Sequence, residues 1–303
     1  MRFNLIFPMR AVKHYTRWIG DSSLGEVARL VEDAGFDGIA MSEHPYPDKE
    51  WLSTGGHHAF DPFVALSMAA QATSRIRLIT YVMVAGYRSP YLGAKAAASL
   101  DLLSGGRFTL GIAAGYLKSE FDALGADFTR RGKLLDEAIA AMRATWVGTE
   151  HDGPEFGVRD HLSLPLPATE GGPPIWIGGN SKAARRRVTE LADGWMPIGQ
   201  SAEMAAITKT PPLEDIESLA KQIGELNKSR ADLDKSAIDV SFVPFEKNLL
   251  RTGDSEAFCS ALAPKLDDYA DAGVSWISVE PASRSFEDFR RDVTVLAERL
   301  IQR

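Results

Sequence analysis

Short β-rich runs alternate with helical patterns along the chain, and this alternation constrains the fold more than any other feature. The β-rich runs are Phe3–Phe7, Gly38–Met41, Arg77–Val84, Phe108–Ile112, Ile175–Ile177, Gly194–Pro197, Ile238–Val243 and Trp276–Val279. Strict alternation of strands and helices predicts a parallel sheet, because parallel neighbours need a long crossover connection. Eight such units favour a closed (β/α)8 TIM barrel.

Helical patterns fill the spaces between these runs. Asp61-Pro62 and Ser89-Pro90 each predict a helix start, with an N-cap residue followed by proline at the first helical position. The first helix should begin after Ser22 or Ser23 and stop at Gly35. The predicted helices are Leu24–Ala34, Pro62–Ala72, Pro90–Leu103, Thr129–Val147, Ser181–Leu191, Leu213–Asn227, Ser255–Ala272 and Ser285–Ile301.

A recurring joint between helix and strand supports the barrel. The segments EDAGFDGIAM, ELADGWMPI and YADAGVSWISV all run from a helix end through glycine into a strand. Glycine at such a joint accepts a positive φ. The alternative is a doubly wound open sheet, but no G-x-G-x-x-G follows the first strand, and GIAAGY at 111–116 has only two glycines.

Composition narrows the class of protein. The chain has 303 residues, a net charge of −7 and 45% hydrophobic residues, which suits one barrel domain over 1–303. The sequence has no dominant basic tract, so a nucleic-acid partner is not expected. The single cysteine, Cys259, fits a reducing compartment, and we expect a cytoplasmic protein without a secretion signal or a membrane span.

Polar residues cluster where the predicted strands end, which is the active face of a barrel. In IAMSEHPYP, the apolar run ends in Ser42, Glu43 and His44, and prolines then stop the strand. Polar groups near a core need a partner or a ligand. The residues Tyr81, Val82, Ala114, Gly115, Tyr116, Gly178, Gly179, Asn180, Ser181 and Gly199 lie in or after later strands. His44 can be a structural strand cap, but its position favours catalysis or cofactor contact.

The stretch Gly178-Gly179-Asn180-Ser181 joins a strand to a helix in the manner of a phosphate cradle. Glycines let the backbone approach an anion, and a helix N-terminus favours negative charge. The alternative is a tight turn with Asn180 or Ser181 as a simple N-cap. The following arginines, 185–187, indicate a solvated helix face.

Other chemistries find little support in the sequence. His57 and His58 are adjacent, and no His-x-Glu or Cys-x-x-Cys spacing accompanies them, so we expect no metal. The absence of a G-x-S-x-G elbow and of a P-loop disfavours a serine hydrolase and a nucleotide triphosphatase. The long connection 42–60, with Tyr46, Trp51 and Phe60, is typical of a lid or an apolar substrate wall.

Three stretches together resemble the bacterial luciferase-like flavin and deazaflavin oxidoreductases. They are GFDGIAMSEH, RIRLITYVMVAGYRSPYLGAKAAASLDLLSGGRFTLGIAAGYLKSEFDALG and PPIWIGGNSKAARRRVTELADGWMPIG. The resemblance implies the eight-stranded barrel and an enzyme that uses a flavin-type cofactor. The version DGWMPIG is most similar to the branch that uses coenzyme F420, with FMN as the alternative cofactor.

The resemblance also implies roles for individual residues. His44 matches the histidine that acts near the ring in the deazaflavin sugar-phosphate dehydrogenases, whereas their acidic residue after the fourth strand falls on Tyr116. Glu120 is the nearby acid and matches a widespread glutamate of the family. A cis peptide is implied at Tyr81–Val82, with Thr80–Tyr81 as the other choice. Glu43 is expected beside the cofactor.

Three functions remain open from the sequence. The first is F420-dependent hydride transfer between the deazaflavin and a small alcohol, carbonyl or alkene, with His44, Tyr116 and Glu120 as candidate catalytic residues. The second is an FMN monooxygenase that receives reduced flavin from a partner reductase. The third is a flavin-binding barrel without catalysis. The resemblance also implies a homodimer that packs through outer helices.

Overall fold

Nine parallel β-segments form one closed sheet in this computed structural model, which describes residues 1–9 and 24–302. They are β1 Arg2–Ile6, β2 Gly38–Met41, β3 Arg77–Thr80, β4 Met83–Val84, β5 Phe108–Ala113, β6 Ile175–Gly178, β7 Gly194–Met196, β8 Asp239–Phe242 and β9 Trp276–Val279. Since β3 pairs with β5 as well as β2, the sheet closes on itself. β3 and β4 are two parts of one interrupted strand, so the fold is the expected (β/α)8 TIM barrel.

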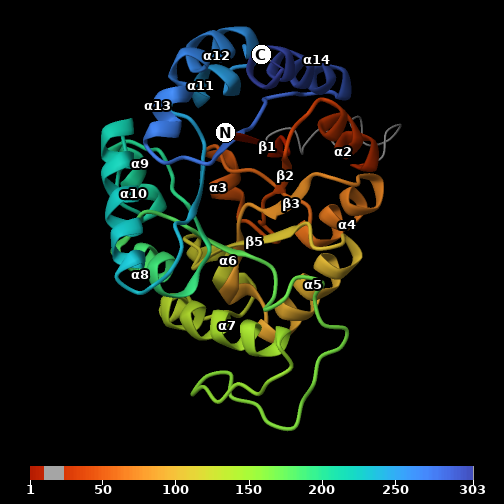
Figure 1. Ribbon diagram of the computed structural model, residues 1–303, viewed down its shortest axis with the longest axis vertical. Helices are drawn as coiled ribbons and strands as arrows, with labels where there is room; N and C mark the ends of the chain where they lie inside the picture. Colours follow the sequence, from red (N-terminus) through yellow and green to blue (C-terminus); the bar gives the residue numbers. More distant parts are fainter. Residues whose placement is uncertain (10–23, 303) are drawn as a thin grey trace.

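Helices surround the strands, as Figure 1 shows. They are α2 Leu24–Asp33, α3 Lys49–Ser53, α4 Pro62–Ala72, α5 Pro90–Leu103, α6 Lys118–Ala123, α7 Arg131–Trp146, α8 Lys182–Leu191, α9 Ala202–Thr208, α10 Ile216–Ala231, α11 Lys247–Arg251, α12 Ser255–Leu262, α13 Leu266–Asp271 and α14 Phe286–Leu296, with the single turns η2 Ala85–Tyr87, η3 Ala263–Lys265 and η4 Ala297–Ile301. The segment between α7 and β6 makes a long excursion beyond α7 (Figure 1).

The strands separate two apolar regions, because successive side chains of a strand point to opposite faces. A large cluster fills the space between strands and helices. A smaller cluster lies inside the barrel and includes Ile79, Trp176, Met196 and Trp276. Burial on both faces explains why the β-rich runs consist mostly of apolar residues.

Local signals set most helix ends. Asp61 accepts hydrogen bonds from the amides of Phe63 and Val64, so α4 has the predicted cap. α5 also begins at its proline, but the Ser89 side chain makes no capping hydrogen bond. Gly35 adopts a φ of 96°, as a glycine stop requires. The proposed start at Ser22 or Ser23 lies outside the described residues.

Two helix predictions were wrong in their extent. The predicted helix Ser255–Ala272 is divided into α12, η3 and α13, and Pro264 lies in the middle turn. Proline lacks an amide hydrogen and crowds the preceding turn, which explains the break. The predicted helix Leu213–Asn227 begins later, at Ile216, where Asp215 accepts a hydrogen bond from the amide of Ser218.

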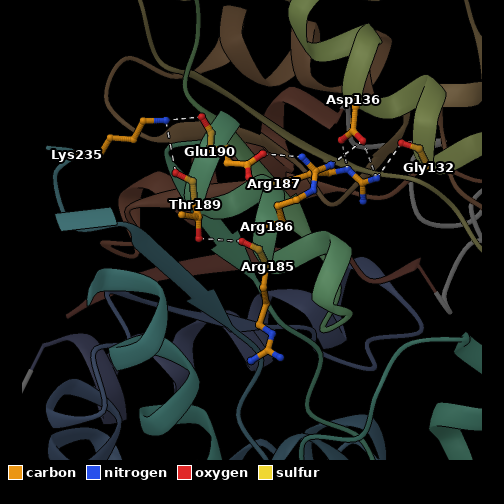
Figure 2. A network of polar contacts seen from close by, with 8 residues as sticks. All are labelled: Gly132, Asp136, Arg185, Arg186, Arg187, Thr189, Glu190 and Lys235. Carbon is orange, nitrogen blue, oxygen red and sulfur yellow. Dashed lines mark hydrogen bonds and ion pairs between the residues drawn. The ribbon is translucent and has the colours of Figure 1, made fainter. Parts of the chain in front are cut away.

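The prediction of a solvated face for all three arginines of α8 was also wrong. Arg187 is only 6% exposed, and its guanidinium donates to both oxygens of Asp136 and to the carbonyl of Gly132. Arg186 is more exposed and bonds to Asp136 and Glu190. Figure 2 shows this Arg187–Asp136 network between α8 and α7. A helix-facing arginine therefore joins two outer helices instead of facing water.

Candidate active site

His44 lies directly after β2, at the end of the barrel where the strands finish. Ser42, Glu43 and His44 are all buried, and His44 is 8% exposed. β2 ends at Met41, and these three residues follow it at the mouth of the barrel, before Pro45. Glu43 and His44 contact different partners, as expected for neighbours in an extended segment.

His44 forms a close pair with Glu120, which lies on α6. The His44 Nδ1 atom is 2.9 Å from Glu120 Oε2, and the Glu120 side chain has no exposed surface. Among the described residues, Nδ1 is the only nitrogen of this ring with a hydrogen-bond partner. The other nitrogen, Nε2, is therefore available to a ligand.

Glu120 is held in its charged form by its surroundings. Burial by itself would raise its pKa, but the hydrogen bond and charge of His44, the Tyr46 amide and the Tyr87 hydroxyl together hold the pKa below its ordinary value. The Tyr46 amide donates to Oε1 at 2.8 Å, and the Tyr87 hydroxyl donates to Oε2 at 2.8 Å. A carboxylate can only accept hydrogen bonds, so the Nδ1 atom of His44 carries a hydrogen toward it.

Aromatic rings enclose His44 on several sides. Its ring centroid lies 4.5 Å from that of Trp51, 4.9 Å from that of His57 and 6.1 Å from that of Tyr116. Trp51 belongs to α3, which lies in the predicted lid. The connection after β2 therefore forms one wall of the site, as its composition indicated.

The lid is tied to the helix that carries Glu120. Asp48 caps α3 by accepting from the amide of Trp51 at 2.7 Å, and its other oxygen accepts from the hydroxyl of Ser119. Ser119 precedes Glu120 on α6. One aspartate thus fixes Trp51 and the carboxylate partner of His44 relative to one another.

Tyr116 lies beside His44 but is a weak acid. Burial and the neighbouring Glu120 charge raise the pKa of Tyr116 to about 12. Its hydroxyl is therefore protonated at neutral pH and can donate a hydrogen bond. The same two causes, with a direct hydrogen bond to Glu120, raise the pKa of Tyr87 above its ordinary value.

Glu43 clamps the segment that follows the interrupted strand. Its Oε2 atom accepts from the amide of Val84 at 2.7 Å, and its Oε1 atom pairs with Arg88. Burial raises the pKa of Glu43 above its ordinary value, although Arg88 and the Val84 amide lower it. Both carboxyl oxygens of Glu43 thus contact protein, and any contact with a cofactor stays a prediction.

The peptide bond Tyr81–Val82 is cis, which confirms the bond implied by the family resemblance. It lies between β3 and β4. A side chain on Gly178, at the end of β6, would meet Val82 and Ala113 at 3.4 Å. Val82, Ala113 and Gly178 therefore lie next to one another, and we call these three residues the apolar floor.

The turn after β6 uses many of its polar groups within the protein. The amide of Gly179 donates to the carbonyl of Met196, and the amide of Asn180 donates to the Thr210 hydroxyl. The Asn180 side chain bonds to both backbone groups of Ile198 and to the carbonyl of Pro211. Asn180 therefore holds two loops together, and the anion-binding role of its backbone is not tested by this geometry.

The start of α8, which is the other part of the predicted phosphate cradle, has fewer of its backbone groups bonded within the protein. Ser181 caps α8 by accepting from the amide of Ala184, and the first amides of a helix have no intrahelical acceptor. Gly179 has a φ of 102°, a conformation that favours glycine. These features leave the N-terminus of α8 available to an anion.

The remaining predicted positions line the same end of the barrel. Ala114 and Gly115 follow β5, and a side chain on Gly115 would collide with Phe121 and Val84 at 2.7 Å. Gly199 follows β7, and its carbonyl accepts from Lys247. The sequence reasoning missed the hydrogen bonds of Tyr87 and the charged cluster around Lys247, because nothing local in the sequence marks either one.

Two absences hold for the part of the chain that the structure describes. Within residues 1–9 and 24–302, no group of three or more histidine, cysteine, aspartate or glutamate side chains could hold a metal ion. No described helix is both long enough and apolar enough to cross a membrane.

Comparison with known proteins identifies the family. The model of the luciferase-like monooxygenase family matches residues 1–225, which is most of the chain. The chain belongs to this family, as its motifs implied.

Two curated relatives illustrate the range of the family. The F420-dependent glucose-6-phosphate dehydrogenase of Rhodococcus erythropolis is 28% identical over 224 residues, covering 71% of this chain and 63% of the relative. The phthiodiolone/phenolphthiodiolone dimycocerosates ketoreductase of Mycobacterium bovis is 31% identical over 187 residues, covering 60% of this chain and 46% of the relative. The chain thus covers less than two thirds of either relative.

Solved structures share the fold over nearly the whole chain. The monooxygenase RslO1 from Streptomyces bottropensis has a TM-score of 0.71 at 21% identity, covering 100% of this chain and 99% of that one. An F420-dependent secondary alcohol dehydrogenase in complex with an F420-acetone adduct has a TM-score of 0.71 at 15% identity, covering 99% and 98%. At these identities the likeness shows the fold alone.

Proposed function

We propose that this protein is an oxidoreductase that uses coenzyme F420 to exchange a hydride with a small alcohol, carbonyl or alkene. The observation that carries the proposal is the His44–Glu120 pair, with one ring nitrogen bonded to a buried carboxylate and the other available at the barrel mouth. The bound deazaflavin would supply the hydride acceptor or donor. The protein must then supply a proton acceptor or donor.

His44 has the geometry for that proton transfer. With Nδ1–H directed at Glu120, Nε2 presents a lone pair that can take a proton from a substrate hydroxyl. The imidazolium that forms is stabilised by the carboxylate 2.9 Å away. In the reverse direction the same Nε2 returns the proton to a developing alkoxide. The rings of Trp51 and His57 pack against the ring of His44.

The residues present fit a deazaflavin or a flavin. The apolar floor of Val82, Ala113 and Gly178 suits a planar ring, and the N-terminus of α8 suits the phosphate of its side chain. Coenzyme F420 is favoured over FMN by the DGWMPIG motif and by the relative that carries F420-dependence in its name. FMN remains the alternative, with a partner reductase in that case.

Side-by-side titration of the apo-protein with F420 and FMN tests the proposed cofactor. We expect tight binding of F420, weak binding of FMN, and bleaching or recovery of F420 absorbance with a panel of alcohols, carbonyls and enoates. Tight binding of FMN alone, with oxygen consumption, would assign the monooxygenase function instead. Cofactor binding without turnover across the panel would favour the barrel without catalysis.

The phosphate site can be tested separately from the chemistry. Gly179→Val places a branched side chain where φ is positive, so F420 affinity should fall roughly tenfold, about 1.4 kcal/mol. Gly105→Val is the matched control, since Gly105 also has a positive φ and open surroundings. Gly105 follows α5 and precedes β5, so it lies at the opposite end of the barrel from the turn after β6. Equal affinities for both variants would remove the turn after β6 from the cofactor site.

A homodimer is part of this proposal. Exposed apolar side chains gather on α4 and α5, and they are Val64, Met68, Leu92, Leu102 and Leu103. An apolar helix face of this kind suits a second copy of the chain. Light scattering should show a dimer, and the double variant Val64→Glu, Leu92→Glu should be monomeric. A monomer of the unaltered chain would contradict the proposed dimer.

We also propose a cytoplasmic location for this protein, on the basis of its single cysteine.

A further inference from the structure

A groove lies on the outside of the barrel, at the end where the strands begin and therefore opposite to His44. It has a volume of about 500 Å³, which is within the range of small-molecule sites. Its walls come from the second half of α7, the end of α8 and the end of α10. Asp193, which immediately precedes β7, also lines it. Nothing in the proposed proton transfer uses this groove.

Three positively charged side chains from separate segments converge on the end of α8. Arg143 on α7, Arg230 on α10 and Lys235 after α10 all line the groove and donate to backbone carbonyls there. The accepting carbonyls are those of Val188, Glu190, Leu191 and Ala192. Figure 2 shows Lys235 beside this end of the helix. Because these carbonyls span little more than one helical turn, about 5.4 Å, the three charged groups lie close together.

Capping of the helix does not by itself account for three positive charges. A helix C-terminus carries about half a negative charge. Asp193 adds one carboxylate, and its Oδ2 atom lies 3.0 Å from the Nη2 atom of Arg143. Asp232 and Asp234 are exposed and lie outside the lining of the groove. Three positive charges thus face one carboxylate and one partial charge, so positive charge is in excess.

The other acid in the wall, Glu190, is matched by a different partner. Its Oε2 atom lies 2.6 Å from Arg186, which also pairs with Asp136. Asp136 in turn pairs with Arg187, as Figure 2 shows. The two arginines and two carboxylates of this network balance one another. Glu190 therefore does not cancel the excess positive charge of the groove.

The cations of the groove keep donors that the helix end does not use. A guanidinium group has five N–H donors and an ammonium group has three. Within the described residues, Arg143 donates only through Nη2, so its Nε and Nη1 groups remain for a ligand. Lys235 donates only to two carbonyls of α8 in the same part of the chain, which leaves its third hydrogen. Arg230 is only 4% exposed and adds charge from the base of the groove.

The arrangement of charged and apolar groups selects the kind of ligand. A phosphate monoester carries nearly two negative charges and three acceptor oxygens on a single phosphorus atom, which suits cations that converge within one helical turn. A dicarboxylate divides the same charge between two separate groups. Ile139 and Ala140 of α7 and Leu191 of α8 line the groove and provide contact for a hydrocarbon.

We propose that this groove binds a small organic phosphate monoester. Arg143 and Lys235 hold the phosphate beside the end of α8, and the apolar part of the ligand lies against Ile139 and Ala140. The site depends neither on F420 nor on His44, so it stands or falls separately from the proposed function.

Calorimetric titration with butyl phosphate, inorganic phosphate and succinate tests the groove. The unaltered protein should bind butyl phosphate most tightly, because this ligand combines converged charge with an apolar body. Lys235→Met and Arg143→Gln should each weaken that binding roughly tenfold. Lys228→Met is the matched control, since Lys228 is exposed near the end of α10 but does not line the groove. Its affinity for butyl phosphate should be unchanged.

A further variant tests the room in the groove without changing its charge. Ala140 is exposed on α7, so Ala140→Phe can fill the groove without disturbing the core. This variant should also bind butyl phosphate roughly tenfold more weakly. Urea denaturation checks that it is as stable as the unaltered protein.

The controls separate this groove from the proposed cofactor site at the start of α8, which also suits a phosphate. Butyl phosphate binding that persists in Gly179→Val and weakens in Lys235→Met would support the groove. Binding that Gly179→Val removes and Lys235→Met leaves intact would overturn the proposal. Unchanged affinity in all three groove variants would overturn it as well, and so would binding of succinate or inorganic phosphate as tight as that of butyl phosphate.

Discussion

Two networks of charged side chains in this molecule differ in the chemistry that their members can perform. The Arg187–Asp136 network joins α8 to α7, and the Arg187 guanidinium bonds to both Asp136 oxygens and to a backbone carbonyl. The His44–Glu120 network joins the end of β2 to α6, and it leaves the His44 Nε2 atom without a protein partner. The first network joins two helices through a guanidinium that stays charged, whereas the second contains an imidazole, which can also take up and release a proton.

The positions of the two networks agree with this difference. Arg187 on α8 faces Asp136 on α7, as Figure 2 shows. His44 lies at the ends of the parallel strands, where barrels place their reactive groups. The aromatic rings of Trp51, His57 and Tyr116 lie close to the ring of His44. Burial of charge by itself therefore does not identify the active site.

Loss of the open imidazole should give the largest effect. His44→Ala should lower kcat by roughly 10²–10⁴ if His44 performs general acid–base catalysis. His44→Asn retains polarity but not the proton transfer, so it should be nearly as slow. Steady-state kinetics beside a cofactor titration measures both effects, and cofactor affinity should change much less. Wild-type kcat in both variants would show that His44 is a structural strand cap. The His44–Glu120 and Arg187–Asp136 networks would then both have structural roles only.

Neutralising the buried partner should have a smaller effect on turnover. Glu120→Gln keeps the shape of the side chain but removes the charge that stabilises an imidazolium, so kcat should fall roughly 10–100-fold. Tyr87→Phe is the control, since it removes one hydrogen bond to Glu120 and keeps the ring against Phe121. A Glu120→Gln enzyme as fast as the unaltered one, with an unchanged pH–rate profile, would assign Glu120 a purely structural role.

Loss of the Arg187–Asp136 network should change stability and not turnover. Arg187→Met removes the bonds to Asp136 and Gly132 and should lower the free energy of unfolding by about 1–3 kcal/mol. Urea denaturation measures this change, and the kcat of the folded variant should stay as it was. A large loss of kcat without loss of stability would show that α8 influences the chemistry through this arginine.

The weakest expected signal is the acid dependence of stability. Glu120 has a pKa below its ordinary value of 4.5 in the folded protein, so it contributes stability at pH values above 4.5. That contribution is lost as the pH falls through the lowered pKa. Unfolding free energies measured between pH 7 and pH 3 should decline less steeply in Glu120→Gln. An equal slope in both proteins would show that the folded state does not favour the carboxylate.

The fold class and several helix ends could be predicted from the sequence. The alternation of β-rich and helical runs fixed the barrel, since periodicity and burial are properties of neighbouring residues. Asp61-Pro62 marked the start of α4, and the prolines after His44 put that residue at a strand end. The motifs around Tyr81 indicated the cis bond through family resemblance. Each of these features depends on residues that are close together in the chain.

The tertiary structure determines which side chains form pairs across distant parts of the chain. Glu120 is 76 positions after His44, and only closure of the barrel brings α6 against the end of β2. The same closure buries Arg187 against α7 and places Lys247 between Gly199 and Glu280. Side-chain pairing across distant elements depends on strand register and helix packing, which local patterns do not encode. The sequence therefore indicated the strand end near which His44 lies, and the fold selected Glu120 as the partner of its Nδ1 atom.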